Sequence, residues 1–211
     1  SSASLILLGG GIEKLTPAAA AALRKGVSLR FIVASDGHYG QAGTEFDLFH
    51  ENFVKNVTAF HAGNPLDFCV INGDIIHDNK DFLVPAKAHF DKLPVNYYVT
   101  KGNHDMVSDP YWKEVWGMGV THEVKVAGNI ILLATTSNEK GEYLSPDLDW
   151  LKDRLEANRK VKNVFMFIHI PQTKWTKHAI ETPGFVELIK QHKNLRAVFH
   201  GHEHDQDGIK M

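Results

Sequence analysis

The chain has 211 residues, of which 43% are hydrophobic and 23% charged, a composition typical of one globular domain with a sizeable core. Its formal net charge of -2 lacks the basic excess of nucleic-acid-binding surfaces. No apolar run approaches the roughly 20 residues that span a bilayer. We therefore expect neither a nucleic-acid partner nor a transmembrane segment, and composition leaves the oligomeric state open.

Residues 1–27 form an N-terminal segment that allows two interpretations. The run from Leu5 to Leu8, with the glycines and alanines that follow, is similar to the apolar centre of an export signal. Alternatively, Thr16 caps a short helix that ends at Gly26. The two interpretations are compatible, and they leave an exported or periplasmic location and a cytoplasmic one both open. We place the main domain at residues 28–211.

Beyond residue 28, signals for buried strands and helices alternate. Apolar runs predict strands over residues 29–34, 68–71 and 95–99 and helices over residues 44–60 and 82–93. Thr44 and Asp47 predict a capping box for the first helix. The core face of that helix is predicted at Phe46, Phe49, Phe53, Val57 and Phe60. The single cysteine, Cys69, lies in a strand run and is expected to be a core thiol. This alternation is typical of parallel β-α-β units.

The second half of the chain changes character. A tight glycine connection joins two β-rich runs at 120–126 and 129–135, which predicts a hairpin in a second, partly antiparallel sheet. Ser145 and Pro146 are expected to open an amphipathic helix. Its apolar face is predicted at Leu148, Leu151 and Leu155. Two further strands are predicted over residues 163–168 and 197–199. The whole pattern predicts a single α/β domain.

Five polar clusters follow one another along the chain, and most of them come directly after an apolar run. They are Asp36-Gly37-His38, Gly73-Asp74, Gly102-Asn103-His104-Asp105, the lone His169 and Gly201-His202-Glu203-His204. A strand holds its last side chain rigidly while the loop beyond it carries chemistry, so clusters at several strand ends can converge on one site. Carboxylate, amide and imidazole donors suit divalent metals. The pattern predicts a dinuclear metal hydrolase.

The spacing inside two clusters supports this interpretation. Asp36 and His38 lie two residues apart, so in extended chain both side chains face the same way and can hold one ion. Gly73 allows a sharp turn before Asp74, whose carboxylate can bridge two metals. Each short motif is weak evidence alone, because such polar turns are common.

The other clusters add different chemistry. Asn103 offers a neutral amide oxygen, which leaves bound metals electrophilic enough to acidify water. His104 beside it is free to face a substrate and to protonate a leaving oxygen. His202 and His204 form another same-face pair, and Glu203 between them is expected to point away as a structural or solvent-facing residue.

Taken together, the five clusters resemble the calcineurin-like metallophosphoesterase superfamily from about Leu29 to His204. The resemblance implies a four-layer α/β/β/α sandwich of two mixed sheets flanked by helices. It also implies two transition-metal ions, for which nitrogen and oxygen ligands favour manganese, iron or zinc. The first metal would be held by Asp36, His38, Asp74 and His204, and the second by Asp74, Asn103, His169 and His202.

The resemblance implies that a hydroxide between the ions attacks phosphorus in line, with His104 as the acid. The family often has an aspartate three residues after the bridging one, where this chain has His77 and then Asp78. We expect Asp78 to orient His104, because a carboxylate raises the basicity of the imidazole that it touches. The sequence stops at Met211, so the second sheet is expected to be abbreviated or the sequence to be a fragment.

The substrate class is predicted less directly. Protein serine/threonine phosphatases of this kind normally have arginines near the bridging aspartate and a glutamate after the catalytic histidine, whereas this chain has Asn79, Lys80 and Asp105. We expect an enzyme that hydrolyses small phosphate esters, with phosphodiesters favoured over phosphomonoesters. A nuclease is disfavoured by the missing basic patch, and an inactive metal-binding scaffold by the intact clusters.

Aromatic side chains near the clusters are a further candidate feature. Each is individually expected to be a packing residue, but together they could line a pocket for a base or another aromatic group. These residues are Tyr39, Tyr111, Trp112, Trp116, Trp175 and His178.

Overall fold

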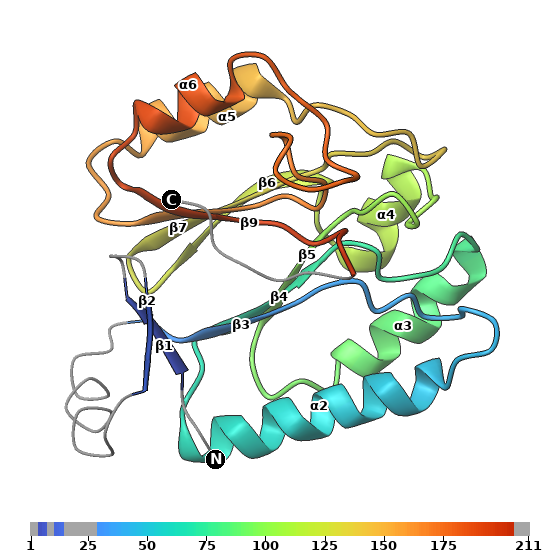
Figure 1. Cartoon of the computed structure of the whole chain (residues 1–211). Helices are drawn as coiled ribbons and strands as arrows, with labels where there is room; N and C mark the ends of the chain where they lie inside the picture. Colours follow the sequence, from blue (N-terminus) through green and yellow to red (C-terminus); the bar gives the residue numbers. More distant parts are fainter. Residues whose placement is uncertain (1–3, 8–10, 15–28, 205–211) are drawn as a thin grey trace. The chain divides into compact units, whose positions relative to one another are not determined.

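The computed structural model describes residues 4–7, 11–14 and 29–204 (Figure 1). The chain divides into two compact units, Ser1–Arg30 and Phe31–Met211. In the first unit, strand β1 (Ser4–Leu7) pairs antiparallel with β2 (Gly11–Lys14). The helix expected between residues 16 and 26 lies outside the described residues, and the placement of the main domain at 28–211 stays a prediction.

The second unit begins with a parallel sheet. Its strands, in spatial order, are β3 (Phe31–Ala34), β4 (Phe68–Asn72) and β5 (Tyr97–Thr100). All three predicted strands are present, and every residue of the central strand β4 is buried. The thiol of Cys69 lies in this strand, and burial raises its pKa to about 12. Because the strands are parallel, their carboxyl ends meet at one edge of the sheet.

Helices cover one face of this sheet. They are α2 (Phe46–Gly63), a 3-10 turn (Lys80–Phe82) that leads into α3 (Leu83–Phe90), and α4 (Asp109–Trp116). The predicted capping box is wrong, because Glu45 is the cap residue of α2 and Thr44 donates its hydroxyl to Gln41 O instead. The predicted core face is also partly wrong: Val57 is buried, but Phe49 and Phe60 are 55% and 46% exposed.

The second sheet is mixed. Its strands, in spatial order, are β6 (Thr121–Val126), β7 (Asn129–Ala134), β8 (Val164–Phe167) and β9 (Leu195–Phe199). Strands β6 and β7 form the predicted antiparallel hairpin, and β7, β8 and β9 run parallel. Ala127 and Gly128 both have positive φ in the connection, which matches the right-handed twist of a two-residue hairpin.

Two helices cover the second sheet, α5 (Leu148–Ala157) and α6 (Phe185–Lys190). Leu151 and Leu155 of α5 are buried as predicted. The cap residue is Asp147, whose side chain accepts from Trp150 N, and Ser145 is not the cap. Figure 1 shows the resulting layers of the second unit, with α2 and α3 outside one sheet and α5 and α6 outside the other. This is the predicted α/β/β/α sandwich, although the described part of the first sheet is parallel throughout.

Aromatic rings and one amide join the two sheets. Phe31 stacks on Phe68 within the first sheet and meets Phe167 of the second edge-on, with ring centroids 4.8 and 6.1 Å apart. At the end of β4, the buried Asn72 donates to Ile168 O beyond β8 and accepts from Thr100 Oγ1. The carboxyl edges of both sheets are thereby fixed against each other.

Candidate metal centre

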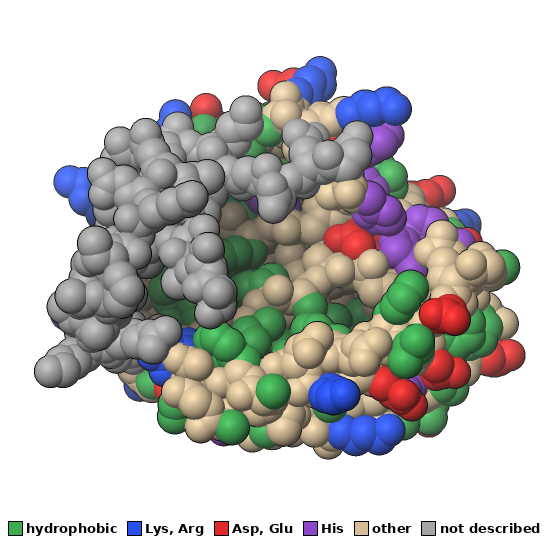
Figure 2. Space-filling view, turned by 60° about the horizontal axis from the view of Figure 1, so that its bottom comes forward, with side chains coloured by type: hydrophobic (Ala, Val, Ile, Leu, Met, Phe, Trp, Pro, Cys, Tyr) green, Lys and Arg blue, Asp and Glu red, His purple; other side chains and the backbone are tan. Residues whose placement is uncertain are grey.

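The seven predicted ligand residues all follow the carboxyl ends of strands in the second unit. Asp36 and His38 follow β3, Asp74 follows β4, Asn103 follows β5, His169 follows β8, and His202 and His204 follow β9. Figure 2 shows histidine side chains gathered beside an acidic side chain at one end of the face in view. Segments that are up to 168 residues apart in sequence thus meet in one place.

The first group of donors consists of Asp36, His38 and His204. Their ligand atoms lie within 4.8 Å of one another, with the two Nε2 atoms 3.1 Å apart and His204 Nε2 3.2 Å from Asp36 Oδ1. Burial lowers the pKa of His38 to about 4, more strongly than the Asp74 carboxylate raises it. The ring of His38 is therefore neutral near pH 7 and offers a free nitrogen lone pair, as a metal ligand must.

The second group consists of Asp74, His169 and His202, again with ligand atoms within 4.8 Å. Asp74 is 1% exposed. Burial raises the pKa of its carboxyl. The contact with His169 and the backbone N–H of His104 lower the pKa by more, so that the result is about 2. Asn103 follows Gly102, whose Cα lies against Asp74 and His169. Among the described residues, the buried Oδ1 of Asn103 has no hydrogen-bond partner. An amide oxygen without a partner is costly unless a cation or water meets it.

His169 gives the strongest indication of a cation. Its Nδ1 lies 2.8 Å from the carbonyl oxygen of Asn72, which only accepts, so Nδ1 carries the proton. The other nitrogen, Nε2, lies 3.1 Å from Asp74 Oδ2 without the alignment of a hydrogen bond. Burial lowers the pKa of His169, yet Asp74 and Asp36 raise it to about 9. The space between the two side chains therefore requires a positive charge, which a proton or a metal ion can supply.

The backbone at these clusters is strained. Six non-glycine residues in the described part of the chain have positive φ. Ala127 belongs to the hairpin turn, and the others are Asp36, His38, Asp74, Asp78 and His202, with φ between 42° and 77°. Each such residue costs about 1 to 3 kcal/mol. Strain of this kind persists where the surrounding structure fixes a backbone that function needs.

Two glycines of the motifs allow the close approach. Gly73 has φ +83°, and a Cβ there would lie 2.5 Å from His169 Cγ. A Cβ at Gly102 would collide with the backbone nitrogen and the carboxylate of Asp74. Any larger residue at either position would push the ligand-bearing loops apart.

The predicted acid lies next to the first group. His104 Nδ1 is 2.7 Å from Asp78 Oδ1, as expected from the sequence. Its backbone N–H donates to Asp74 Oδ1, so the same segment also supports the Asp74 carboxylate. The side chain of His104 is 32% exposed, which leaves Nε2 accessible from solvent.

Sequence reasoning missed the role of Asp105. This residue is fully buried and accepts hydrogen bonds from Ile75 N, Ile76 N and Gly102 N at 2.8 to 2.9 Å. Burial and the neighbouring Asp74 raise its pKa to about 7, and the backbone donors oppose the shift. Asp105 thereby joins the loop after β4 to the loop after β5. A carboxylate that follows the Asn-His pair directly was the only signal for it.

The candidate aromatic residues divide between the surface and the core, and most of them are the packing residues that each was individually expected to be. Of the six aromatic and imidazole candidates, Trp175 and His178 are exposed, whereas Tyr39, Trp112 and Trp116 are buried and Tyr111 packs on the same core cluster. Tyr143, which the sequence did not single out, meets His202 edge-on with centroids 4.9 Å apart. Glu203 is structural and not solvent-facing, since its buried carboxylate accepts from His178 N at 2.7 Å.

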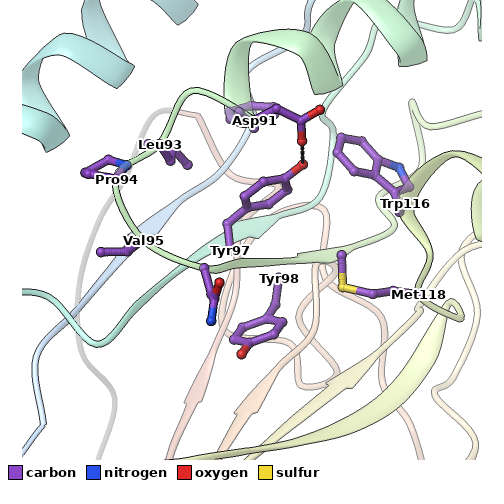
Figure 3. Close-up of a pocket in the computed structure, with 10 residues that line it drawn as sticks. Asp91, Leu93, Pro94, Val95, Tyr97, Tyr98, Trp116 and Met118 are labelled. Atoms are coloured by element: carbon purple, nitrogen blue, oxygen red, sulfur yellow. Dashed lines mark hydrogen bonds between the residues drawn. The ribbon is translucent and has the colours of Figure 1, made fainter.

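A separate hollow lies at the opposite end of β5. It has a volume of about 590 Å³ and is lined by Phe90, Tyr97 and Trp116 among others (Figure 3). Its carboxylate, Asp91, is held by Lys87 Nζ and by the hydroxyl of Tyr97. None of the candidate metal-ligand groups among the described residues lies there. The presence of a hollow is therefore not sufficient to identify the metal site.

A sequence model of the calcineurin-like phosphoesterase family matches residues 29–206, and the chain belongs to that family. By class it is a metal-dependent phosphoric ester hydrolase. Across the described residues, we find no helix with the length and apolar character to cross a membrane. The chain matches none of the curated proteins with which it was compared.

Solved structures share the fold. A dimetal phosphatase from Danio rerio superposes with a TM-score of 0.67 at 16% identity, covering 84% of this chain and 82% of its own. A provisionally assigned 5′-nucleotidase from Staphylococcus aureus gives a TM-score of 0.58 at 16% identity, covering 85% of this chain and 46% of its own. An NAD nucleotidase from Haemophilus influenzae gives 0.50 at 12% identity, with coverage of 83% and 38%.

Proposed function

We propose that the chain is a two-metal phosphodiesterase that acts on small substrates. The first ion would be held by Asp36, His38, Asp74 and His204, and the second by Asp74, Asn103, His169 and His202. The observation that carries this assignment is that Asn103 Oδ1, His169 Nε2 and His202 Nε2 are buried and have no hydrogen-bond partner in the described part of the chain. Imidazole, amide and carboxylate donors without thiolate suit manganese, iron or zinc. When bound, two such ions acidify a water molecule and withdraw charge from phosphate.

His104 would protonate the leaving oxygen. Its Nδ1 donates to Asp78 Oδ1, which fixes the ring and leaves Nε2 to carry the proton that is transferred. The centroid of its ring lies 4.8 Å from that of the His38 ring, and its backbone N–H reaches Asp74 Oδ1, so His104 stands beside both donor groups.

The preference for diesters rests on charge. A monoester dianion is held more tightly when positive side chains assist the two ions, and two of the described arginines make their hydrogen bonds away from the donor groups. Arg159 pairs with Glu156 and Arg196 bonds to Asn163, at the amino ends of β8 and β9. A diester carries a single charge, and its alkoxide leaving group depends on an acid such as His104.

Two measurements test the proposal. Elemental analysis of metal-reconstituted protein should find two transition-metal ions per chain, and one ion or none would reject the dinuclear assignment. With manganese, bis(p-nitrophenyl) phosphate or a cyclic nucleotide should be hydrolysed with higher kcat/KM than p-nitrophenyl phosphate. A consistent preference for the monoester across several metals would make the chain a phosphatase and leave the metal assignment intact.

A further inference from the structure

We propose that His77 is a positioning residue that fixes the tautomer of the ligand His38 and couples it to the acid His104. This inference rests on the proposed function. His77 Nδ1 lies 3.2 Å from His38 Nδ1, and the rings meet edge-on with centroids 5.2 Å apart. The backbone N–H of His77 donates to Tyr39 O, so the two segments are joined at main chain and side chain.

The direction of the His77–His38 hydrogen bond follows from geometry. The Nε2 atom of His38 faces the other donors, 3.1 Å from His204 Nε2 and 3.8 Å from Asp74 Oδ2. If His38 binds an ion through Nε2, its proton must be on Nδ1, which then donates. His77 Nδ1 is therefore the acceptor. Metal-ligating histidines generally donate their second N–H to an acceptor, which sets ring orientation and raises ligand basicity.

The same ring contacts the acid. With Nδ1 accepting, the proton of His77 is on Nε2, which lies 3.9 Å from Asp78 Oδ2. The other oxygen of Asp78 holds His104 Nδ1 at 2.7 Å. His77 also stacks on His104, with ring centroids 4.9 Å apart and planes 9° apart. One ring thus contacts the ligand of the first ion, the carboxylate that orients the acid, and the acid itself.

These contacts separate two functions of His77 that substitutions can isolate. His77→Phe keeps a flat ring for stacking on His104 but offers no acceptor to His38. His77→Asn keeps an acceptor near the position of Nδ1 but loses the ring. His61→Phe is a matched control, because His61 also accepts a hydrogen bond through Nδ1, from Leu66 N at the far end of α2.

The experiment is titration of the metal-free full chain with Mn²⁺, in which free Mn²⁺ is followed by electron paramagnetic resonance. His77→Phe should weaken one of the two binding steps by roughly 10- to 100-fold and leave the other unchanged. His77→Asn and His61→Phe should bind both ions with wild-type affinity. If His77→Phe does not fold, by circular dichroism of the metal-free chain, His77→Ala should give the same loss.

The outcomes discriminate between the two proposals. Wild-type binding of both ions by His77→Phe would overturn the role of His77 and leave the dinuclear assignment intact. Equal losses in the Phe and Asn variants would also overturn it, because the acceptor would not be the important feature. Binding of a third ion by the wild type, lost in both variants, would make His77 a ligand instead. Failure of the wild type to bind two ions would reject the proposed function itself.

Discussion

Each end of the first sheet carries an aspartate beside aromatic or imidazole rings, but the two aspartates differ in backbone geometry and in hydrogen-bond partners. At the carboxyl edge, Asp74 has a strained backbone and faces an imidazole nitrogen of His169 that has no hydrogen-bond partner among residues 29–204. Near the amino end of β5, Asp91 has ordinary helix-end geometry and two partners, Lys87 and Tyr97. Unpaired polar atoms that are buried together, and not the hollow beside Asp91, indicate where a ligand binds.

Replacing the shared carboxylate should have the largest effect. Asp74→Ala removes a donor from both proposed ligand sets, so metal content should fall from two ions per chain to fewer than one, and hydrolysis should fall to the uncatalysed rate. Asp91→Ala at the opposite end is the matched control and should retain both ions. Plasma emission spectroscopy of desalted protein measures the difference, and equal metal content in the two variants would contradict the comparison.

Removing the proposed acid should separate catalysis from metal binding. His104→Ala should lower kcat by about 10²- to 10⁴-fold for a cyclic nucleotide, whose alkoxide must be protonated. The loss should be smaller for bis(p-nitrophenyl) phosphate, because p-nitrophenolate leaves without a proton. Metal content should remain at two ions, whereas His202→Ala should lose an ion. A loss that is independent of the leaving group would argue against general acid catalysis.

Stability should also differ between buried and exposed carboxylates. Asp105→Asn replaces an acceptor of three backbone N–H groups with an amide that presents a donor to them, and should lower the free energy of unfolding by about 2 to 3 kcal/mol. Asp91→Asn alters an exposed ion pair and should cost less than about 1 kcal/mol. Urea denaturation of the metal-free variants measures both values. Equal costs would mean that Asp105 does not join the two loops.

The smallest effect is expected for chemical labelling of Cys69, at the centre of the first sheet. Because burial raises the pKa of Cys69 to about 12, the thiol should remain protonated at pH 8 and react with a maleimide only after unfolding. Mass spectrometry of labelled protein, with and without urea, checks this expectation. Rapid labelling of the folded chain would contradict this expectation, because it would require β4 to become exposed to solvent without global unfolding.

The strands and the polar clusters at their ends were predictable because their signals are local. Apolar runs ending in Asp, Asn or His placed all seven donor residues at strand ends. The helix caps were not predictable from the sequence. Thr44 and Ser145 are good cap residues, but in the folded chain their hydroxyls donate to other backbone carbonyls. Helix α4 was missed although Ser108 and Gly117 bracket it. The placement of Tyr143 at the rim depends on contacts across the fold that no local pattern encodes.

The amide of Asn72 has a consequence for the thermodynamics of ion binding. It bonds to groups of both sheets directly beneath the donor residues, so the spacing of those donors is set before any ion arrives. Binding should then order few residues and bury little additional surface, which means a heat-capacity change near zero. A small metal domain that folds around its ion buries much surface on binding and therefore shows a large negative heat-capacity change. In this chain, calorimetry would record mainly the exchange of protons and water for metal.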